Sequence, residues 1–222
     1  MNLESKLLQF ALLVGAMGCG EMAIAKTPAQ PNKILNLAFE APDDGFDMVK
    51  TYNFYSGNIA EAIFEPLLKY DYLARPVVLV PNTAQALPKI EQEGKVYTFK
   101  IQPGIYFTDD PAFKGKRREL TAQDYIYSIQ RVSDPKNHSP TYSFIDGKIQ
   151  GLEQVVANAK KTGKFNYDAP ISGLKALDKY TLQFTLTRAD YNFPYILAYV
   201  TFSGTAREVV EFYGDRIGQH PV

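Results

Sequence analysis

The sequence predicts a fold of mixed helices and strands, because two antiparallel hairpin patterns flank a helical one. Residues 89–101 and 174–186 each alternate apolar and polar positions around a turn, as antiparallel strand pairs do. Residues 122–132 instead place their apolar side chains along one stripe of a helix. Helices interspersed with antiparallel hairpins indicate an α/β or α+β fold. The 222 residues are enough to bury a sizeable core.

The region before the first hairpin contains two strand patterns and one helix pattern. Residues 34–39 predict a first strand and residues 68–72 predict a half-buried one, because both alternate apolar and polar positions. A helix is predicted over 56–65, and Pro66 should end it, since a residue before proline is driven out of the α region. Three apolar residues would form the buried face of this helix: Ile59, Ile63 and Phe64.

The first hairpin is the clearest local signal. It joins 89–91 to 95–101 through Gln92-Glu93-Gly94, and Pro103-Gly104 makes the next turn. Its inward residues would be Tyr97, Phe99 and Ile101. The helix that follows begins at Thr121, which can cap it, and Asp124 is favourably placed near the positive end of the helix dipole.

Three further elements complete the pattern. A helix over 152–161 ends at Gly163, and a second hairpin turns at Asp178-Lys179. The inward residues of this hairpin would be Leu182, Phe184 and Leu186. A short helix over 209–213 is closed by Gly214.

The first residues have the pattern of an export signal. The apolar run 7–17 is too short to cross about 30 Å of hydrocarbon as a helix, and it fits the core of a secretory signal. Cleavage after Ala23-Ile24-Ala25 would remove residues 1–25 and release a soluble protein beginning at Lys26. Alternatively, Ala16-Met17-Gly18-Cys19 resembles a lipobox, so that residues 1–18 would be removed and Cys19 acylated. A buried N-terminal helix is a third interpretation of the same run.

Composition excludes several classes of function. Lys plus Arg equals Asp plus Glu at 24 each, so no net charge attracts the chain to nucleic acid. Cys19 is the only cysteine, which rules out an internal disulfide and a cysteine-based metal cluster. The sequence has no nucleotide-binding motif and none for a cofactor. Any ATPase that works with this protein would be a separate chain.

Each of a few polar clusters can be interpreted either as a functional site or as an ordinary turn or solvated loop. Asp43-Asp44 and Asp109-Asp110 could hold a metal, but acid pairs beside Gly or Pro are typical of turns. Asp109, Asp110 and His138 could serve a secreted hydrolase, although no familiar spacing joins them. The run 114–118, KGKRR, could contact a permease or a phosphate, and a solvated loop is favoured.

Five segments follow one another along the chain: NIAEAIFEPLLKYD (58–71), GKVYTFKIQPGIYFTDD (94–110), LTAQDYIYSIQRVSDP (120–135), LKALDKYTLQFTL (174–186) and AREVVEFYGD (206–215). In this order they resemble family 5 of the extracellular solute-binding proteins, the dipeptide- and oligopeptide-binding group. Residues 58–71 match the helix that follows the first strand in that family. One departure is the tryptophan that the family often has near position 87, where this chain has Leu87.

The resemblance implies a periplasmic-binding-protein-like fold of type II. Residues 26–222 would be the first lobe with its smaller subdomain, ending before a second lobe that the family continues into. The ligand would lie in a cleft between lobes. By the resemblance, aromatic and polar residues of this chain would line it: Tyr52, Asn53, Phe54, Tyr55 and Tyr142. The bland alternative is that these aromatic residues only pack the local elements together.

The implied function is that of a substrate-binding component of an ABC importer. It would bind peptides or related small solutes in the periplasm, possess no enzymatic activity, bind no cofactor or metal, and deliver its ligand to a permease in the inner membrane. Residues that select the solute are expected largely in the second lobe. The alternatives are a truncated non-binding remnant, an interaction module, or a secreted hydrolase.

Overall fold

The structure is a computed structural model in which residue 36 and residues 38–51 and 53–222 are described. The leader, Cys19, Tyr52 and most of the strand expected at 34–39 therefore lie outside the described residues. Asn36, Ala38 and Phe39, the members of that segment that are described, are not in a strand. The elements that follow all belong to the unit Phe39–Val222.

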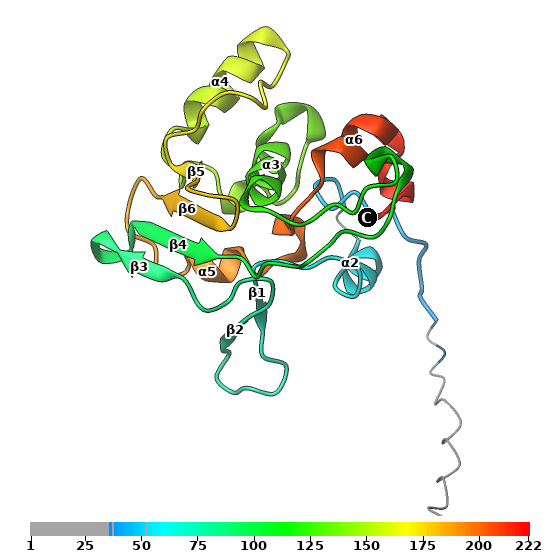
Figure 1. Cartoon of the computed structure of the whole chain (residues 1–222), viewed down its shortest axis with the longest axis horizontal. Coiled ribbons are helices and arrows are strands. Elements are labelled where there is room, and N and C mark those ends of the chain that lie inside the picture. The colour runs from blue at the N-terminus through cyan, green and yellow to red at the C-terminus, as the bar shows by residue number, and fades with distance from the viewer. Residues whose placement is uncertain (1–35, 37, 52) are drawn as a thin grey trace, which may run out of the picture. The chain divides into compact units, whose positions relative to one another are not determined.

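The largest sheet of this unit has four antiparallel strands in the order β3–β4–β6–β5 (Figure 1). Both predicted hairpins are confirmed, and they meet through β4 and β6, where Tyr97 is opposite Phe184 and Phe99 is opposite Leu182. The strands run over Lys89–Glu91 (β3), Val96–Lys100 (β4), Leu174–Ala176 (β5) and Thr181–Thr185 (β6).

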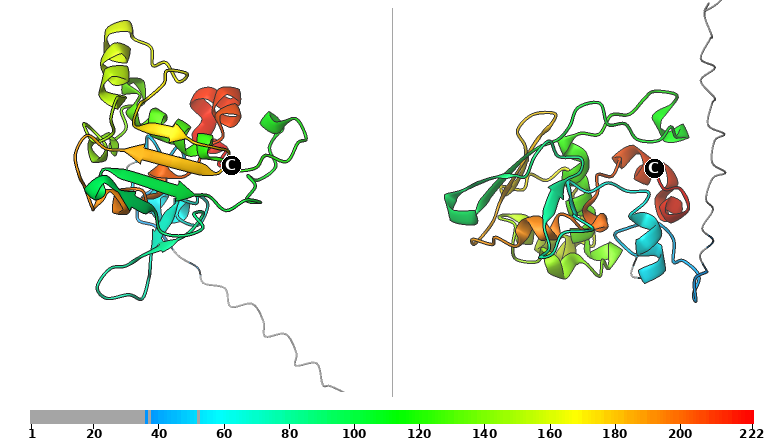
Figure 2. Two further views of the ribbon diagram at one scale, coloured as in Figure 1. Left: turned by 60° about the vertical axis from the view of Figure 1, so that its left-hand side comes forward. Right: turned by 90° about the horizontal axis from the view of Figure 1, so that it is seen from below.

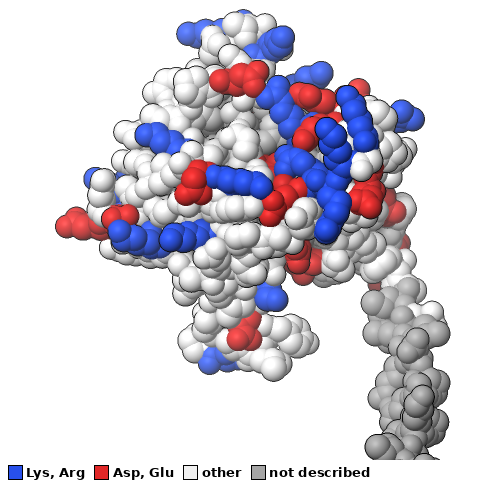
Figure 3. All heavy atoms as spheres, in the orientation of Figure 1, with Lys and Arg blue, Asp and Glu red and all other residues white. Residues whose placement is uncertain are grey.

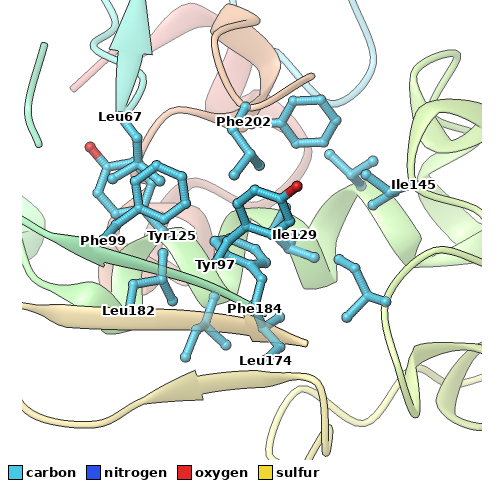
Figure 4. Packing of buried hydrophobic residues seen from close by; sticks show 14 of the residues in the cluster. Leu67, Tyr97, Phe99, Tyr125, Ile129, Ile145, Leu174, Leu182, Phe184 and Phe202 are labelled. Atoms are coloured by element: carbon cyan, nitrogen blue, oxygen red, sulfur yellow. The ribbon is translucent and has the colours of Figure 1, made fainter. Parts of the chain in front are cut away.

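One face of the sheet carries the core, which helices α3 (Ala122–Ser133) and α5 (Phe193–Ile196) help to build. Tyr97, Phe99 and Phe184 are all 0% exposed, as the alternation predicts. Figure 4 shows them with Tyr125 and Ile129, which α3 contributes. The ring centre of Phe193 lies 5.5 Å from that of Tyr97 and 5.1 Å from that of Phe184.

The opposite face of the sheet is polar. Thr98 and Gln183 lie on it, and the Gln183 side-chain amide donates to the Thr98 hydroxyl at 3.1 Å. Lys100 is exposed. Strands with one buried and one solvated face show this alternation, which is why the sequence signal was strong here.

The predicted ends of α3 are confirmed by its hydrogen bonds. The Asp124 carboxylate reaches back and accepts from the Thr121 backbone N–H at 2.7 Å and from its hydroxyl at 2.9 Å. The helix ends before Asp134-Pro135. Helix α4 spans Leu152–Thr162, with Gly163 in the left-handed region after it. Helix α6 spans Arg207–Tyr213 and is followed by Gly214, two residues longer at its start than predicted.

A second sheet consists of β1 (Leu68–Tyr70) and β2 (Leu79–Pro81). Their hairpin projects away from the four-stranded sheet, as Figures 1 and 2 show. Leu68 is fully buried, whereas Tyr70 is 40% and Tyr72 is 87% exposed. The strand predicted at 68–72 therefore exists, but its inward face is limited to its first residue, because the hairpin leaves the core.

The helix predicted over 56–65 is shifted: α2 spans Phe54–Ala60. After Ala60 the backbone bonds tighten, with Ile63 N–H donating to Ala60 O. The expected apolar face was also wrong, because the buried residues of α2 are Ser56 and Ala60, and Ile63 is 41% exposed. Small side chains let this short helix lie close to its neighbours, and the Ser56 hydroxyl accepts from Asp44 N–H at 2.9 Å.

Candidate functional site

The start of α2 is held in a single conformation by its cap residue, Asn53. The Asn53 side-chain oxygen accepts from Tyr55 N–H at 2.8 Å, and its amide nitrogen donates to Pro42 O at 2.8 Å. Its backbone N–H donates to the Asp44 carboxylate at 3.1 Å. Its carbonyl accepts from Gly57 N–H. Asn53 is thus fully used in tying the preceding loop to the helix, and its role is to position its neighbours.

The residues after this cap form a small aromatic group. Phe54 is 74% exposed. The Tyr55 ring lies 5.2 Å from Phe39 and 5.8 Å from Phe54, in the second case edge to face. Its hydroxyl donates to Glu40 at 3.4 Å, which is a long bond. Among the described residues of this aromatic group, Phe54 has the most exposed ring, and an exposed aromatic ring is suited to contact a ligand side chain.

The loop before α2 is anchored to α3 by a buried ion pair. Arg131 donates to both carboxylate oxygens of Asp47, at 2.9 and 3.0 Å. The Thr51 hydroxyl bonds to Gly45 O and Asp47 O, both at 3.1 Å. A bidentate pair of this kind restricts both partners strongly. The position of the α2 start is therefore set by the main core and not by the loop alone.

Tyr142, the other aromatic candidate, begins a short 3-10 turn, Tyr142–Phe144. Its ring packs against the main core, and its hydroxyl donates to Asp146 at 2.8 Å. Burial, together with the Asp146 carboxylate, raises the pKa of Tyr142, so the phenol stays protonated. Its hydroxyl already has a partner, which leaves the ring edge as the part that a ligand could touch.

The structure does not bring all the candidates into contact. Within the described residues, no hydrogen bond or ring contact joins Tyr142 to Asn53, Phe54 or Tyr55, and Tyr52 lies outside them. Sequence reasoning missed a second set of partly exposed aromatic residues: Tyr70, Phe144, Tyr195 and Tyr199. They come from three parts of the chain, with Tyr70 in β1, Phe144 in the 3-10 turn 142–144, and Tyr195 and Tyr199 in the segment 193–199, so no single local periodicity could have grouped them.

The acid pairs have structural roles. Asp43 accepts from Gly45 N–H at 3.0 Å, as a turn former does. Asp110 accepts from Ala112 N–H at 2.8 Å and from the Tyr213 hydroxyl at 2.9 Å. His138 is exposed and shares no described contact with Asp110. Among the described residues, no three His, Cys, Asp or Glu side chains are grouped so that they could hold a metal.

The basic run 114–118 is divided between surface and interior. Arg118 pairs with Asp124 at 2.6 Å and with Glu208 at 2.7 Å, so it is structural. The Arg117 guanidinium lies 3.9 Å from the ring centre of Tyr106. In Figure 3 cationic side chains are spread over the visible face, with a denser group on the right that has carboxylates among it. This mixture of signs agrees with a solvated loop.

Comparison with known families settles the class of the protein. Residues 78–222, well over half of the chain, match the bacterial extracellular solute-binding proteins, family 5, middle part. The chain belongs to this family. The family consists of binding proteins, not enzymes. The family that was predicted from the sequential order of the five segments is therefore confirmed. Along the part of the chain that the structure describes, no helix has the length and apolar character needed to cross a bilayer.

Individual members of family 5 resemble the chain over a limited part of their length. The periplasmic oligopeptide-binding protein OppA of Escherichia coli is 29% identical over 72% of this chain and 26% of its own. Di/tripeptide-binding protein 2 of Pseudomonas aeruginosa is 33% identical over 59% of this chain and 23% of its own. The chain thus spans about a quarter of the length of these curated relatives.

Solved structures of the family show the same fold. OppA of Listeria monocytogenes bound to peptide has a TM-score of 0.65 and 27% identity, over 82% of this chain and 32% of its own. The described residues therefore have the periplasmic-binding-protein fold that was predicted, and they correspond to about a third of such a receptor. The helices and antiparallel sheets of this chain form one part of that fold.

Proposed function

We propose that this chain acts as the peptide-binding part of an ABC importer, in which it binds a peptide outside the cytoplasm and passes it to a membrane permease. The permease and its ATPase would be separate proteins. Residues 1–25, or 1–18 if Cys19 is acylated, would direct export. The receptor would carry out no reaction. The observation that carries the proposal is the capped start of α2, which presents Phe54 to solvent on a chain that resembles oligopeptide-binding proteins.

Each candidate residue has a distinct proposed role. Phe54 would contact a ligand side chain, because its ring is exposed and held by the capped turn. Asn53 would position it, since both of its backbone groups and both side-chain atoms are already bonded. Tyr55 would support the Phe54 ring from one side. Tyr52 and the ring edge of Tyr142 would add further aromatic surface.

The test is a binding measurement with a mixed library of di- to hexapeptides on purified residues 26–222, followed by nuclear magnetic resonance. We expect saturable binding that Phe54→Ala weakens roughly 2- to 12-fold, the value of a typical aromatic contact. Phe212→Ala is the matched control, because Phe212 is likewise an exposed phenylalanine, at 59%, and it lies on a different helix, α6. Equal effects of the two variants would contradict the assignment of Phe54.

The expected affinity is low. The chain covers about a third of the peptide-bound OppA of Listeria monocytogenes, so residues 26–222 offer only part of the surface that such a receptor has. Losing about 5 kcal/mol of contacts would weaken binding by between three and four powers of ten. Submicromolar binding by a compact monomer, measured by calorimetry and light scattering, would show instead that these residues suffice for tight recognition.

A further inference from the structure

An open groove of about 480 Å³ lies beside the β1–β2 hairpin. Its walls come from the turn after α2, from the hairpin, and from the segment between α5 and the 3-10 turn Val200–Phe202. In the view from below in Figure 2, α2, the β1–β2 hairpin and α5 lie next to one another on this side of the unit. The groove is formed by segments that are far apart in the sequence. The described candidates from the sequence, Asn53, Phe54, Tyr55 and Tyr142, do not line it.

The walls of the groove are mainly apolar and aromatic. Phe64, Tyr70, Tyr72 and Val200 line it. The Tyr72 ring, 87% exposed on the hairpin, stands at its outer edge. Surfaces of this composition are more often binding sites than ordinary solvent-exposed surface.

Tyr70 connects the groove to an aromatic patch on the adjoining surface. Its hydroxyl donates to Tyr195 O at 2.9 Å, which holds the ring in place, and the ring centres of Tyr70 and Tyr195 are 6.2 Å apart. Beyond them, Tyr199 meets Phe144 edge to face at 5.3 Å. Burial raises the pKa of Tyr70, and the neighbouring Tyr199 and Tyr195 add to the effect, so its phenol is neutral. The Tyr70 ring, which lines the groove, is therefore preorganised by contacts within the fold.

The groove also carries carboxylates. Glu61 and Glu65 line it and are exposed, and neither forms an ion pair with another residue in the described ranges. Lys69 is the single cation of the lining and is likewise without an ion-pair partner there. Two carboxylates beside aromatic rings are complementary to a positive group adjoining an apolar side chain, since the carboxylates attract the cation and the ring faces favour it as well.

We propose that this groove binds an aromatic side chain of a peptide that carries a positive charge next to it, either a free amino terminus or an Arg or Lys side chain. The inference rests on the proposed function, because it takes the ligand to be a peptide. The aromatic side chain packs between Phe64, Tyr70 and Val200. Its neighbouring cation faces Glu61 and Glu65.

The absence of tryptophan from the chain allows a direct test. The probe is an N-acetylated tripeptide amide of arginine, tryptophan and alanine, in which the arginine side chain is the single cation. Its tryptophan fluorescence can be excited without exciting the protein. Two control peptides replace its tryptophan by alanine or its arginine by glutamate, and binding of all three is followed by nuclear magnetic resonance. On direct excitation of its tryptophan, we expect the probe's emission to shift to the blue when it binds. Excitation of the protein's tyrosines should then give energy transfer to the bound tryptophan. The probe should bind at least about fivefold tighter than either control peptide.

The variants separate the two parts of the site. The double substitution Glu61→Gln and Glu65→Gln should weaken the probe roughly 3- to 10-fold and reduce its salt dependence, because it removes charge but little volume. Tyr72→Ala should weaken it by a similar factor. Glu153→Gln and Phe212→Ala are the matched controls, since both residues are exposed and lie on α4 and α6. Unchanged denaturation midpoints confirm that each variant is folded.

The outcomes distinguish this inference from the function on which it rests. Equal binding of the three peptides, with no effect of the groove variants but weakening by Phe54→Ala, would overturn the groove assignment and leave peptide binding intact. No binding of any peptide to the unsubstituted protein would contradict peptide binding itself, and the groove assignment with it. Both the groove assignment and peptide binding are supported if the groove variants weaken binding of the arginine-tryptophan probe and leave binding of the two control peptides unchanged.

Discussion

Asp47 and Arg131 form a bidentate ion pair in the interior, with side chains only 8% and 6% exposed. The pair joins the loop before α2 to the third turn of α3. Removing one partner leaves a buried charge without its counter-ion, which costs about 3–5 kcal/mol. We therefore expect Asp47→Ala and Arg131→Met each to lower the free energy of unfolding by about that amount, as measured by chemical denaturation.

Two comparisons show whether burial is the cause of this effect. Lys50 lies 3.9 Å from the same Asp47 carboxylate but is 43% exposed, so Lys50→Met should cost less than about 1 kcal/mol. The double variant Asp47→Ala with Arg131→Met should be less destabilised than the sum of the two single changes. Additive losses would mean that the two residues act independently.

The core prediction concerns Phe99 and Phe184, which are paired edge to face at 5.9 Å and are both fully buried. Truncating either to alanine should lower the free energy of unfolding by about 3–5 kcal/mol, because apolar contacts are lost and a cavity remains. Tyr72→Ala is the aromatic control, since Tyr72 is 87% exposed. Losses below about 1 kcal/mol at both phenylalanines would contradict the register of β4 and β6.

The acid stability of the fold should depend on Glu119. Hydrogen bonds from Lys179, from Gly104 N–H and from the Tyr180 hydroxyl hold the pKa of Glu119 at about 2. In an unfolded chain the pKa of a glutamate is about 4.3. The contribution of ionised Glu119 to stability is therefore complete above that pH and is lost as the pH falls towards about 2.

Glu119→Gln should make the stability of the protein less dependent on pH in this acid window, measured by urea denaturation at a series of pH values. Lys179→Met, which removes the strongest of the three donors at 2.6 Å, should move the loss of stability to higher pH. An unchanged pH profile in both variants would show that these contacts do not form in solution.

Export is predicted from the apolar run at residues 7–17. Expressed with its leader in a Gram-negative host, the protein should be found outside the cytoplasm, beginning at Lys26 or at acylated Cys19, as mass spectrometry can show. Labelling with fatty acid that disappears in Cys19→Ala would identify the lipoprotein route. A cytoplasmic protein that retains Met1 would rule out both routes.

The sequence alone determined those features that depend on neighbouring residues. The hairpin at 89–101, the Asp124 contact with Thr121 and the stop at Gly163 follow from alternation, capping and a left-handed glycine, all of which involve residues a few positions apart. The order of such segments was also enough to indicate the solute-binding family, which the match over residues 78–222 then confirmed.

Only the tertiary structure decided how these pieces combine. The pairing of Tyr97 with Phe184 joins two hairpins across a long sequence separation, and no local pattern specifies it. Helix α2 ends at Ala60, before the predicted end at residue 65. It buries the small side chains of Ser56 and Ala60, because these allow closer packing than the larger apolar side chains that were expected to be buried. The groove and its aromatic patch likewise arise where separate elements meet. Local hydrogen bonding can be read along a chain, whereas a surface shared by distant segments exists only after they have folded together.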